Sequence, residues 1–147
     1  MVKVILGSGP GFKKQEGQIG IDYIKEFNPD IVADIRKGIP LEDDSADEIN
    51  CEHTLEHIQL NEDFIFVMNE IWRVLKSGGT VYIEVPHKDS EMAYESVEHT
   101  RFFTKHTFMN FYDNPYHKEM GYPLFQLVSC EVAMRKQHKI VQVCLRK

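Results

Sequence analysis

The sequence predicts an α/β protein with a doubly wound, mostly parallel β-sheet that ends in an antiparallel hairpin. Two observations lead to this prediction. Short apolar runs, bounded by glycine, proline or acidic residues, alternate with loops and helical patterns, which is typical of parallel sheets covered by helices. The last two apolar stretches, residues 124–134 and 139–146, follow each other closely enough to pair as an antiparallel hairpin at the edge of the sheet.

The first half of the chain is predicted to hold four short strands. Residues 3–6 are apolar and β-branched, and they stop at Gly-Ser-Gly-Pro-Gly, a turn that glycine permits. Residues 18–22 and 29–34 form the second and third strands, and each ends at an aspartate. Residues 48–51 form the fourth. The segment 52–58 that follows is expected to begin a helix.

The clearest helix is expected to begin at Asn61, which is a favoured capping residue. Its apolar face recurs at spacings of three and four: Phe64, Val67, Met68, Ile71, Trp72 and Leu75. The Lys-Ser-Gly-Gly sequence at 76–79 ends this helix, and residues 80–86 form a fifth strand. A second helix is predicted to begin at Thr104, with Phe108, Phe111 and Tyr112 on one face.

Length and composition restrict the class of protein. We expect a single domain over residues 1–147, since this length suffices for only one domain with its own core. The net charge of -6 argues against nucleic acid as a partner. The three cysteines lack the short paired spacing of a disulfide framework or a zinc module, and no apolar run has the length of a membrane span. We therefore expect a cytoplasmic protein.

Functional residues are expected directly after the strands, because ligands bind to parallel sheets at the carboxyl ends of the strands. Gly7 and Gly9 follow the first strand and let a ligand approach the backbone closely. Asp22 can accept hydrogen bonds from two ribose hydroxyls, and Asp34 can accept one from the amine of adenine. Either aspartate alone would be unremarkable as a turn residue. The glycine turn and the two acids in this order are more specific.

These segments resemble the class I S-adenosylmethionine-dependent methyltransferases, and in particular the small, Methyltransferase type 11-like members. The resemblance covers nearly the whole chain and rests on VILGSGPG, GIDY, VADIRKGIPLEDDSADEINCEHTLEHI and VMNEIWRVLKSGGTVYIEVP. It implies a Rossmann-like fold and S-adenosyl-L-methionine as cofactor. The cofactor-binding residues that it implies are Gly7, Ser8, Gly9, Asp22, Tyr23, Asp34, Ile35, Cys51, Glu52 and His53.

The resemblance also implies different roles for these residues. Gly7 to Gly9 and Cys51 to His53 would line the methionine portion, and Asp22 would hold the ribose. Tyr23, Asp34 and Ile35 would contact the adenine. The chain departs from the family between its first two strands, where Pro10, Gly11 and Gly17 argue against the usual helix. The fold is therefore a truncated one, and a second subunit or a mobile loop is the expected means of completing the pocket.

Transfer of a methyl group from a sulfonium requires alignment and exclusion of water more than a fixed catalytic side chain. Where the acceptor must lose a proton, histidine is the usual base, and His53, His87 and His99 are the candidates. Arg101 is the candidate for binding an anionic acceptor, with a structural salt bridge as the alternative. A small-molecule acceptor is favoured, although the sequence does not identify it.

Two other functions remain open. Residues 53–57 match the H-x-x-E-H pattern of inverted zinc proteases, and on a helix His53 and His57 would share one face, with Glu56 as a base. This would make the protein a zinc hydrolase. The position after the fourth strand explains the same letters without a metal, so no metal is predicted. The other alternative is a non-catalytic partner subunit that keeps the fold, and homo-oligomers are also compatible with the sequence.

Overall fold

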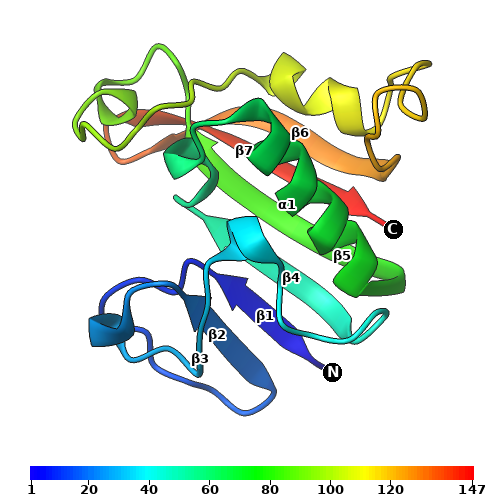
Figure 1. Cartoon of the computed structure of the whole chain (residues 1–147). Helices are drawn as coiled ribbons and strands as arrows, with labels where there is room; N and C mark the ends of the chain where they lie inside the picture. Colours follow the sequence, from blue (N-terminus) through cyan, green and yellow to red (C-terminus); the bar gives the residue numbers. More distant parts are fainter.

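The computed structural model describes all 147 residues, and a seven-stranded mixed sheet forms its centre (Figure 1). The strands are β1 Lys3–Leu6, β2 Gln18–Asp22, β3 Ile31–Val32, β4 Ala46–Glu52, β5 Leu75–Pro86, β6 Gln126–Arg135 and β7 His138–Arg146. Their order in the sheet is β3-β2-β1-β4-β5-β7-β6. The first five strands pair in parallel, whereas β7 is antiparallel to both β5 and β6. The predicted fold class is confirmed.

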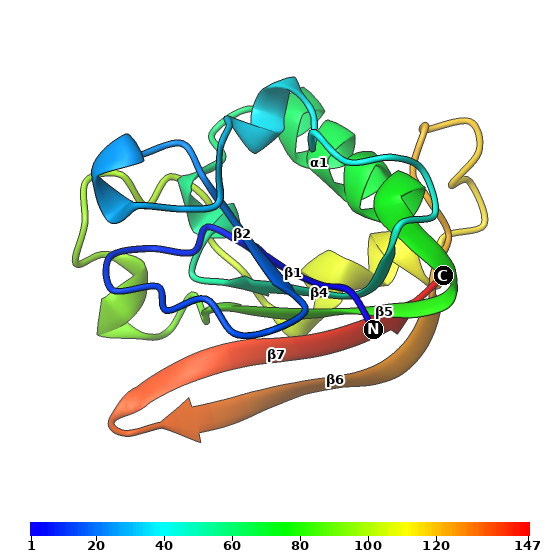
Figure 2. The same ribbon diagram turned by 90° about the horizontal axis from the view of Figure 1, so that it is seen from below.

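Helix α1, Asn61–Val74, is the single α-helix, and it covers one face of the sheet (Figure 2). Four residues of its predicted apolar face are buried in the helix: Phe64, Val67, Met68 and Ile71. Trp72 is only partly buried, and Leu75 is buried but already belongs to β5, so the prediction that residues 76–79 end the helix is wrong. The prediction that Asn61 caps the helix is wrong: the cap is Leu60, and Asn61 is the first helical residue. Its side chain instead accepts a hydrogen bond from Arg101. No helix has the length and apolar character needed to cross a membrane.

The opposite face of the sheet carries no α-helix, and β7 and β6 curve along this side in Figure 2. The strand residues that point this way are largely polar, as Lys3 and Glu48 in an ion pair and Asn50 and Glu52 in a 2.7 Å hydrogen bond illustrate. Residues 10–18 form no helix, as predicted from their proline and glycines. A polar face of this kind is compatible with contact with water.

Two predicted helices are shorter or tighter than expected. The segment 52–58 contains only the single 3₁₀ turn η3, Leu55–His57, so the helix prediction there is wrong. The reason is local: His53 has a φ of +50°, and its N–H continues the strand pairing by donating to the Glu84 carbonyl at 2.9 Å. The second helix is the 3₁₀ helix η5, Lys105–Phe111, which Thr104 caps as predicted.

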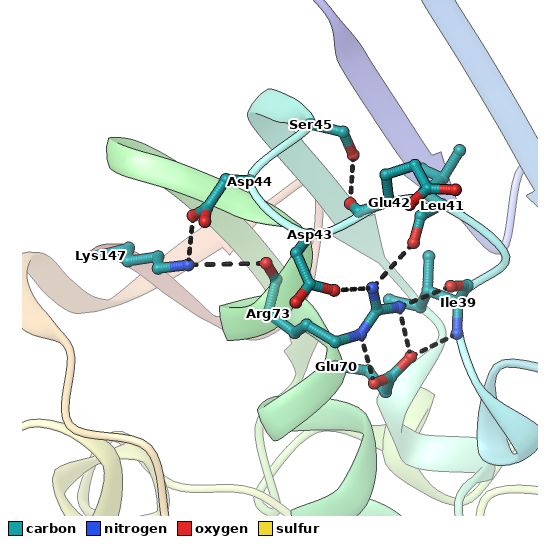
Figure 3. A network of polar contacts seen from close by, with 9 residues as sticks. All are labelled: Ile39, Leu41, Glu42, Asp43, Asp44, Ser45, Glu70, Arg73 and Lys147. Atoms are coloured by element: carbon teal, nitrogen blue, oxygen red, sulfur yellow. Dashed lines mark hydrogen bonds and ion pairs between the residues drawn. The ribbon is translucent and has the colours of Figure 1, made fainter.

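Arg73 near the end of α1 ties residues 39–43 to the helix (Figure 3). Its guanidinium donates to both Glu70 carboxylate oxygens at 2.7 and 2.8 Å, to the carbonyls of Ile39 and Leu41 at 2.8 Å each, and to Asp43 at 2.7 Å. Glu70 also accepts the Ile39 N–H at 2.8 Å. A planar guanidinium can make this many directed bonds at once, whereas a lysine cannot.

Replacing Glu70 with glutamine is expected to lower the free energy of unfolding at neutral pH by about 1–3 kcal/mol, because a charged hydrogen-bonded partner of Arg73 is lost. Arg73 holds the pKa of Glu70 below its ordinary value of 4.5. The contribution of Glu70 is therefore present above pH 4.5 and is lost as the pH falls through the lower folded pKa. Urea unfolding across this acid range should show a shallower pH dependence for Glu70→Gln than for wild type.

The matched control is Glu42→Gln, an exposed carboxylate in the same loop whose side chain takes no part in the Arg73 network. This variant should follow the wild-type curve. An unchanged acid slope in Glu70→Gln would show that this ion pair does not contribute to the pH dependence.

Candidate functional site

A cavity of about 400 Å³ opens at the carboxyl ends of β1, β2, β3 and β4, a volume within the range of small-molecule sites. Of the ten residues predicted to bind a cofactor, seven line it: Gly7, Gly9, Asp22, Tyr23, Asp34, Ile35 and His53. Ser8, Cys51 and Glu52 do not. Cys51 is fully buried in the apolar core, and Glu52 points to the opposite, polar face, where it meets Arg135.

The glycine turn after β1 follows the backbone path that its sequence predicted. Gly7 and Gly9 have φ values of +66° and +69°, which L side chains rarely adopt. Gly7 also has no room for a side chain, since a Cβ there would stand 2.1 Å from the Thr54 hydroxyl oxygen. That hydroxyl is held by the carbonyls of Leu6 and Glu52 at 3.2 and 3.0 Å. The turn is therefore packed directly against the end of β4.

Asp22 fixes this turn from the end of β2. Its side chain is buried, and its two carboxylate oxygens accept the N–H groups of Gly9 and Ile24, each at 2.9 Å. A carboxylate has about four acceptor positions, so two remain for ligand hydroxyls. Asp22 thus both shapes the cavity wall and offers it an acceptor.

Asp34 caps the 3₁₀ turn η2, Ile35–Lys37, by accepting the Arg36 N–H at 3.0 Å. The Arg36 guanidinium also donates to both of its carboxylate oxygens, at 2.8 and 2.9 Å. These bonds from Arg36 hold the pKa of Asp34 below its ordinary value, against the opposing effect of burial. Asp34 is therefore ionised at neutral pH and presents an oriented carboxylate beside Ile35.

His53 joins the cavity to a buried polar cluster. Its Nε2 lies 3.1 Å from Glu84, and its Nδ1 lies 3.5 Å from Glu56. Glu56, more than Glu84, raises the pKa of His53, while burial opposes the effect. Burial alone would raise the pKa of Glu84, but hydrogen bonds from Gln142, Arg135 and Tyr82 outweigh it and lower that pKa. Both carboxylates therefore favour the charged imidazolium.

The other predicted catalytic and substrate residues lie outside the cavity wall. His87 accepts the Asp89 N–H at 3.2 Å in the turn after β5. His99 has its Nδ1 2.9 Å from the Met92 carbonyl. Arg101 lines a separate cavity of about 210 Å³ beside α1, where it donates to the Ile58 carbonyl at 3.0 Å and stacks over Phe64. Its contacts are structural, although they are hydrogen bonds and not the salt bridge considered from the sequence.

Ten of the residues that line the cavity were not among the predicted cofactor-binding residues, and three of these ten are titratable: Arg36, His57 and Glu98. The Asp-x-Arg spacing at 34–36 was the one local signal, since a turn brings these side chains together. His57 was read only as part of a metal pattern. Glu98 comes from a loop more than sixty positions beyond the third strand, so no local pattern could place it at this cavity.

Comparisons with known proteins agree with this geometry. Residues 13–83 match the family model of a methyltransferase domain, whereas a comparison with curated proteins gives no match. A SAM dependent methyltransferase from Aquifex aeolicus is 17% identical, with a TM-score of 0.68 over 99% of this chain and 81% of that one. Burkholderia thailandensis 1,6-didemethyltoxoflavin-N1-methyltransferase, solved with bound 1,6-didemethyltoxoflavin and S-adenosylhomocysteine, is 14% identical, with a TM-score of 0.69 over 99% of this chain and 70% of that one.

A third similar structure is a putative methyltransferase in complex with the Haloferax volcanii Trm112 methyltransferase activator, which is 13% identical with a TM-score of 0.69 over 99% of this chain and 81% of that one. Together the sheet order and the similar solved structures establish the fold. The chain has the class I S-adenosylmethionine-dependent methyltransferase fold, as its sequence resemblance predicted.

Proposed function

We propose that the protein binds S-adenosyl-L-methionine in the 400 Å³ cavity and transfers its methyl group to a small-molecule acceptor. The observation that carries this proposal is that the glycine turn, Asp22 and Asp34, which are far apart in sequence, line one cavity at the carboxyl ends of the strands. Similar structures described as SAM-dependent methyltransferases, one of them with bound S-adenosylhomocysteine, support the choice of cofactor.

The cavity wall suits the parts of this molecule. Gly7 and Gly9 present backbone without side chains, Asp22 keeps acceptor positions for ribose hydroxyls, and Asp34 is an oriented acceptor for an exocyclic amine. Ile35 offers an apolar surface, and the Tyr23 ring, 62% exposed, is free to pack on a purine. The cofactor supplies an electrophilic methyl group, so the protein has to align the acceptor and exclude water.

Of the three histidines predicted to act in the reaction, His53 is the one that lines the cavity, and we assign it to contact with the acceptor. His53→Asn is expected to lower the rate of methyl transfer about 10- to 100-fold with little change in cofactor affinity. A misplaced acceptor reduces the rate of transfer more than it reduces the binding of the cofactor. Asparagine tolerates the positive φ at this position. Rate and affinity should be measured on the same preparation.

The matched control is His106→Asn, on an exposed part of η5 away from the cavity. It should retain both quantities. A His53→Asn variant that transfers methyl groups at the wild-type rate would show that His53 does not position the acceptor.

The proposal is tested by incubating the protein with S-adenosyl-L-methionine labelled in its methyl group and separate pools of metabolites, proteins and nucleic acids. Label transferred to a small molecule supports the proposal. Label transferred only to protein or nucleic acid would show that the acceptor is a macromolecule and not a small molecule. Cofactor binding without transfer to any pool would favour the non-catalytic partner subunit.

A further inference from the structure

Three potential metal ligands converge beside the cavity. Glu56 and His57 belong to η3, and His99 lies in the loop before Phe103. One ligand atom from each lies within 4.8 Å of the other two. The His57 and His99 rings pack edge to face, with their centroids 4.8 Å apart. The convergence is built into the backbone, because the Glu56 carbonyl accepts the N–H groups of Thr100 and Arg101 at 2.9 and 3.2 Å.

The Glu56 side chain is the unexplained member of this cluster. It is 1% exposed, and neither of its carboxylate oxygens has a hydrogen-bond partner. Its nearest basic neighbour is His53, whose Nδ1 is 3.5 Å away while its other nitrogen faces Glu84. A buried carboxylate is costly unless it is paired, hydrogen-bonded or bound to a metal. The position of Glu56 is therefore suited to a cation.

His99 is oriented as a metal ligand would be. A backbone carbonyl can only accept, so the Nδ1 that lies 2.9 Å from the Met92 carbonyl carries the proton. In the neutral ring with this tautomer, Nε2 is left as the ligand atom. Metal-bound histidines almost always donate their second ring N–H in this way, which fixes both tautomer and ring direction. His57 is exposed, so its ring can rotate toward the other two residues.

We propose that Glu56, His57 and His99 bind one divalent transition-metal ion, with zinc as the first choice. Two histidines and one glutamate are an established zinc ligand set that leaves a coordination position open for water or substrate. Ligand atoms around a tetrahedral zinc are about 3.4 Å apart, so the separations of up to 4.8 Å between these ligand atoms shorten by at most about 1.4 Å on binding. The ion lies next to the cofactor cavity, because His57 lines it.

The proposed ligands differ from those of the zinc pattern found in the sequence, and the proposal replaces the prediction that the protein binds no metal. The pattern made His53 a ligand and Glu56 a base, but the two nitrogens of His53 face Glu84 and Glu56. His99 takes the place of His53, and Glu56 is a ligand. The site does not depend on S-adenosylmethionine, so it stands or falls separately from the proposed function.

Chelator-treated, untagged full-length protein should be titrated with Zn²⁺ by calorimetry and with Co²⁺ by visible absorption. One equivalent should bind, and the cobalt spectrum should show d–d bands without thiolate charge transfer. His57→Ala and His99→Ala should each weaken binding more than about tenfold, the lower limit seen even for outer-shell changes. The exposed His106→Ala should bind as wild type does. Glu56→Gln should also weaken binding, but this variant can fold poorly because Glu56 is buried. In that case the result for the exposed His57→Ala decides the test.

Three outcomes would contradict the proposed metal site. These are the absence of stoichiometric binding, wild-type affinity in both His57→Ala and His99→Ala, and a cobalt spectrum with thiolate charge transfer, which would place the ion on a cysteine.

Discussion

Asp22→Ala is expected to weaken the binding of S-adenosyl-L-methionine about 100-fold or more. The substitution removes the acceptor for the ribose hydroxyls and releases the N–H groups of Gly9 and Ile24, which shape the cavity wall. A hydrogen bond to a charged group contributes about 1.5–3 kcal/mol, and each 1.4 kcal/mol corresponds to a factor of ten in affinity. Calorimetric titration of the folded variant measures this loss directly.

Asp30→Ala is the matched control for this experiment. Asp30 also accepts a backbone N–H, from Gly20 at 2.9 Å, but it does not line the cavity. Its replacement should change cofactor affinity no more than a few-fold. A folded Asp22→Ala that binds as tightly as wild type would remove Asp22 from the site.

Gly7→Ala is expected to lower the free energy of unfolding by about 2–6 kcal/mol and to prevent cofactor binding. Two costs contribute, each about 1–3 kcal/mol: the positive φ of +66°, and the overlap of the new Cβ with Thr54, whose hydroxyl oxygen is 2.1 Å away. The substitution would also narrow the cavity there, because Gly7 and Thr54 both line it. Urea unfolding and cofactor titration of the same variant separate the loss of stability from the loss of binding.

The two costs can be distinguished with two further variants. Gly11 has a φ of +85° but nothing within 4 Å of its added Cβ, so Gly11→Ala should show the conformational cost alone. Adding Thr54→Ala to Gly7→Ala should recover the steric part. Equal destabilisation by Gly7→Ala and Gly11→Ala would contradict the close packing of Gly7 against Thr54.

The fold could be predicted because its main signals are local. The apolar runs that end in glycine or aspartate mark the strand ends, and the stripe from Phe64 to Ile71 marks the buried face of α1. Because parallel strands place their carboxyl ends at one edge, the residues that follow them can be assigned to one site before their distances are known. Gly7, Asp22 and Asp34 meet there for this reason.

The remaining details depend on contacts between distant segments. A helix over 52–58 was predicted from residue pattern, but His53 adopts a positive φ and meets Glu84, which is 31 positions later in the chain. Arg101 was a candidate either for binding an anionic acceptor or for a structural salt bridge, and the fold places it over the Phe64 ring with a hydrogen bond to the Ile58 carbonyl. His57 and His99 also come into contact only when the chain is folded. None of these contacts has a periodic signature in the sequence.

Calorimetric titration of the wild-type chain with S-adenosyl-L-methionine, with folding checked by circular dichroism, measures directly whether the cavity is a cofactor site. We expect saturable binding of one molecule per chain, with competition by S-adenosylhomocysteine for the same site. A folded chain that shows no saturable binding of either molecule would contradict the assignment of the 400 Å³ cavity as the cofactor site.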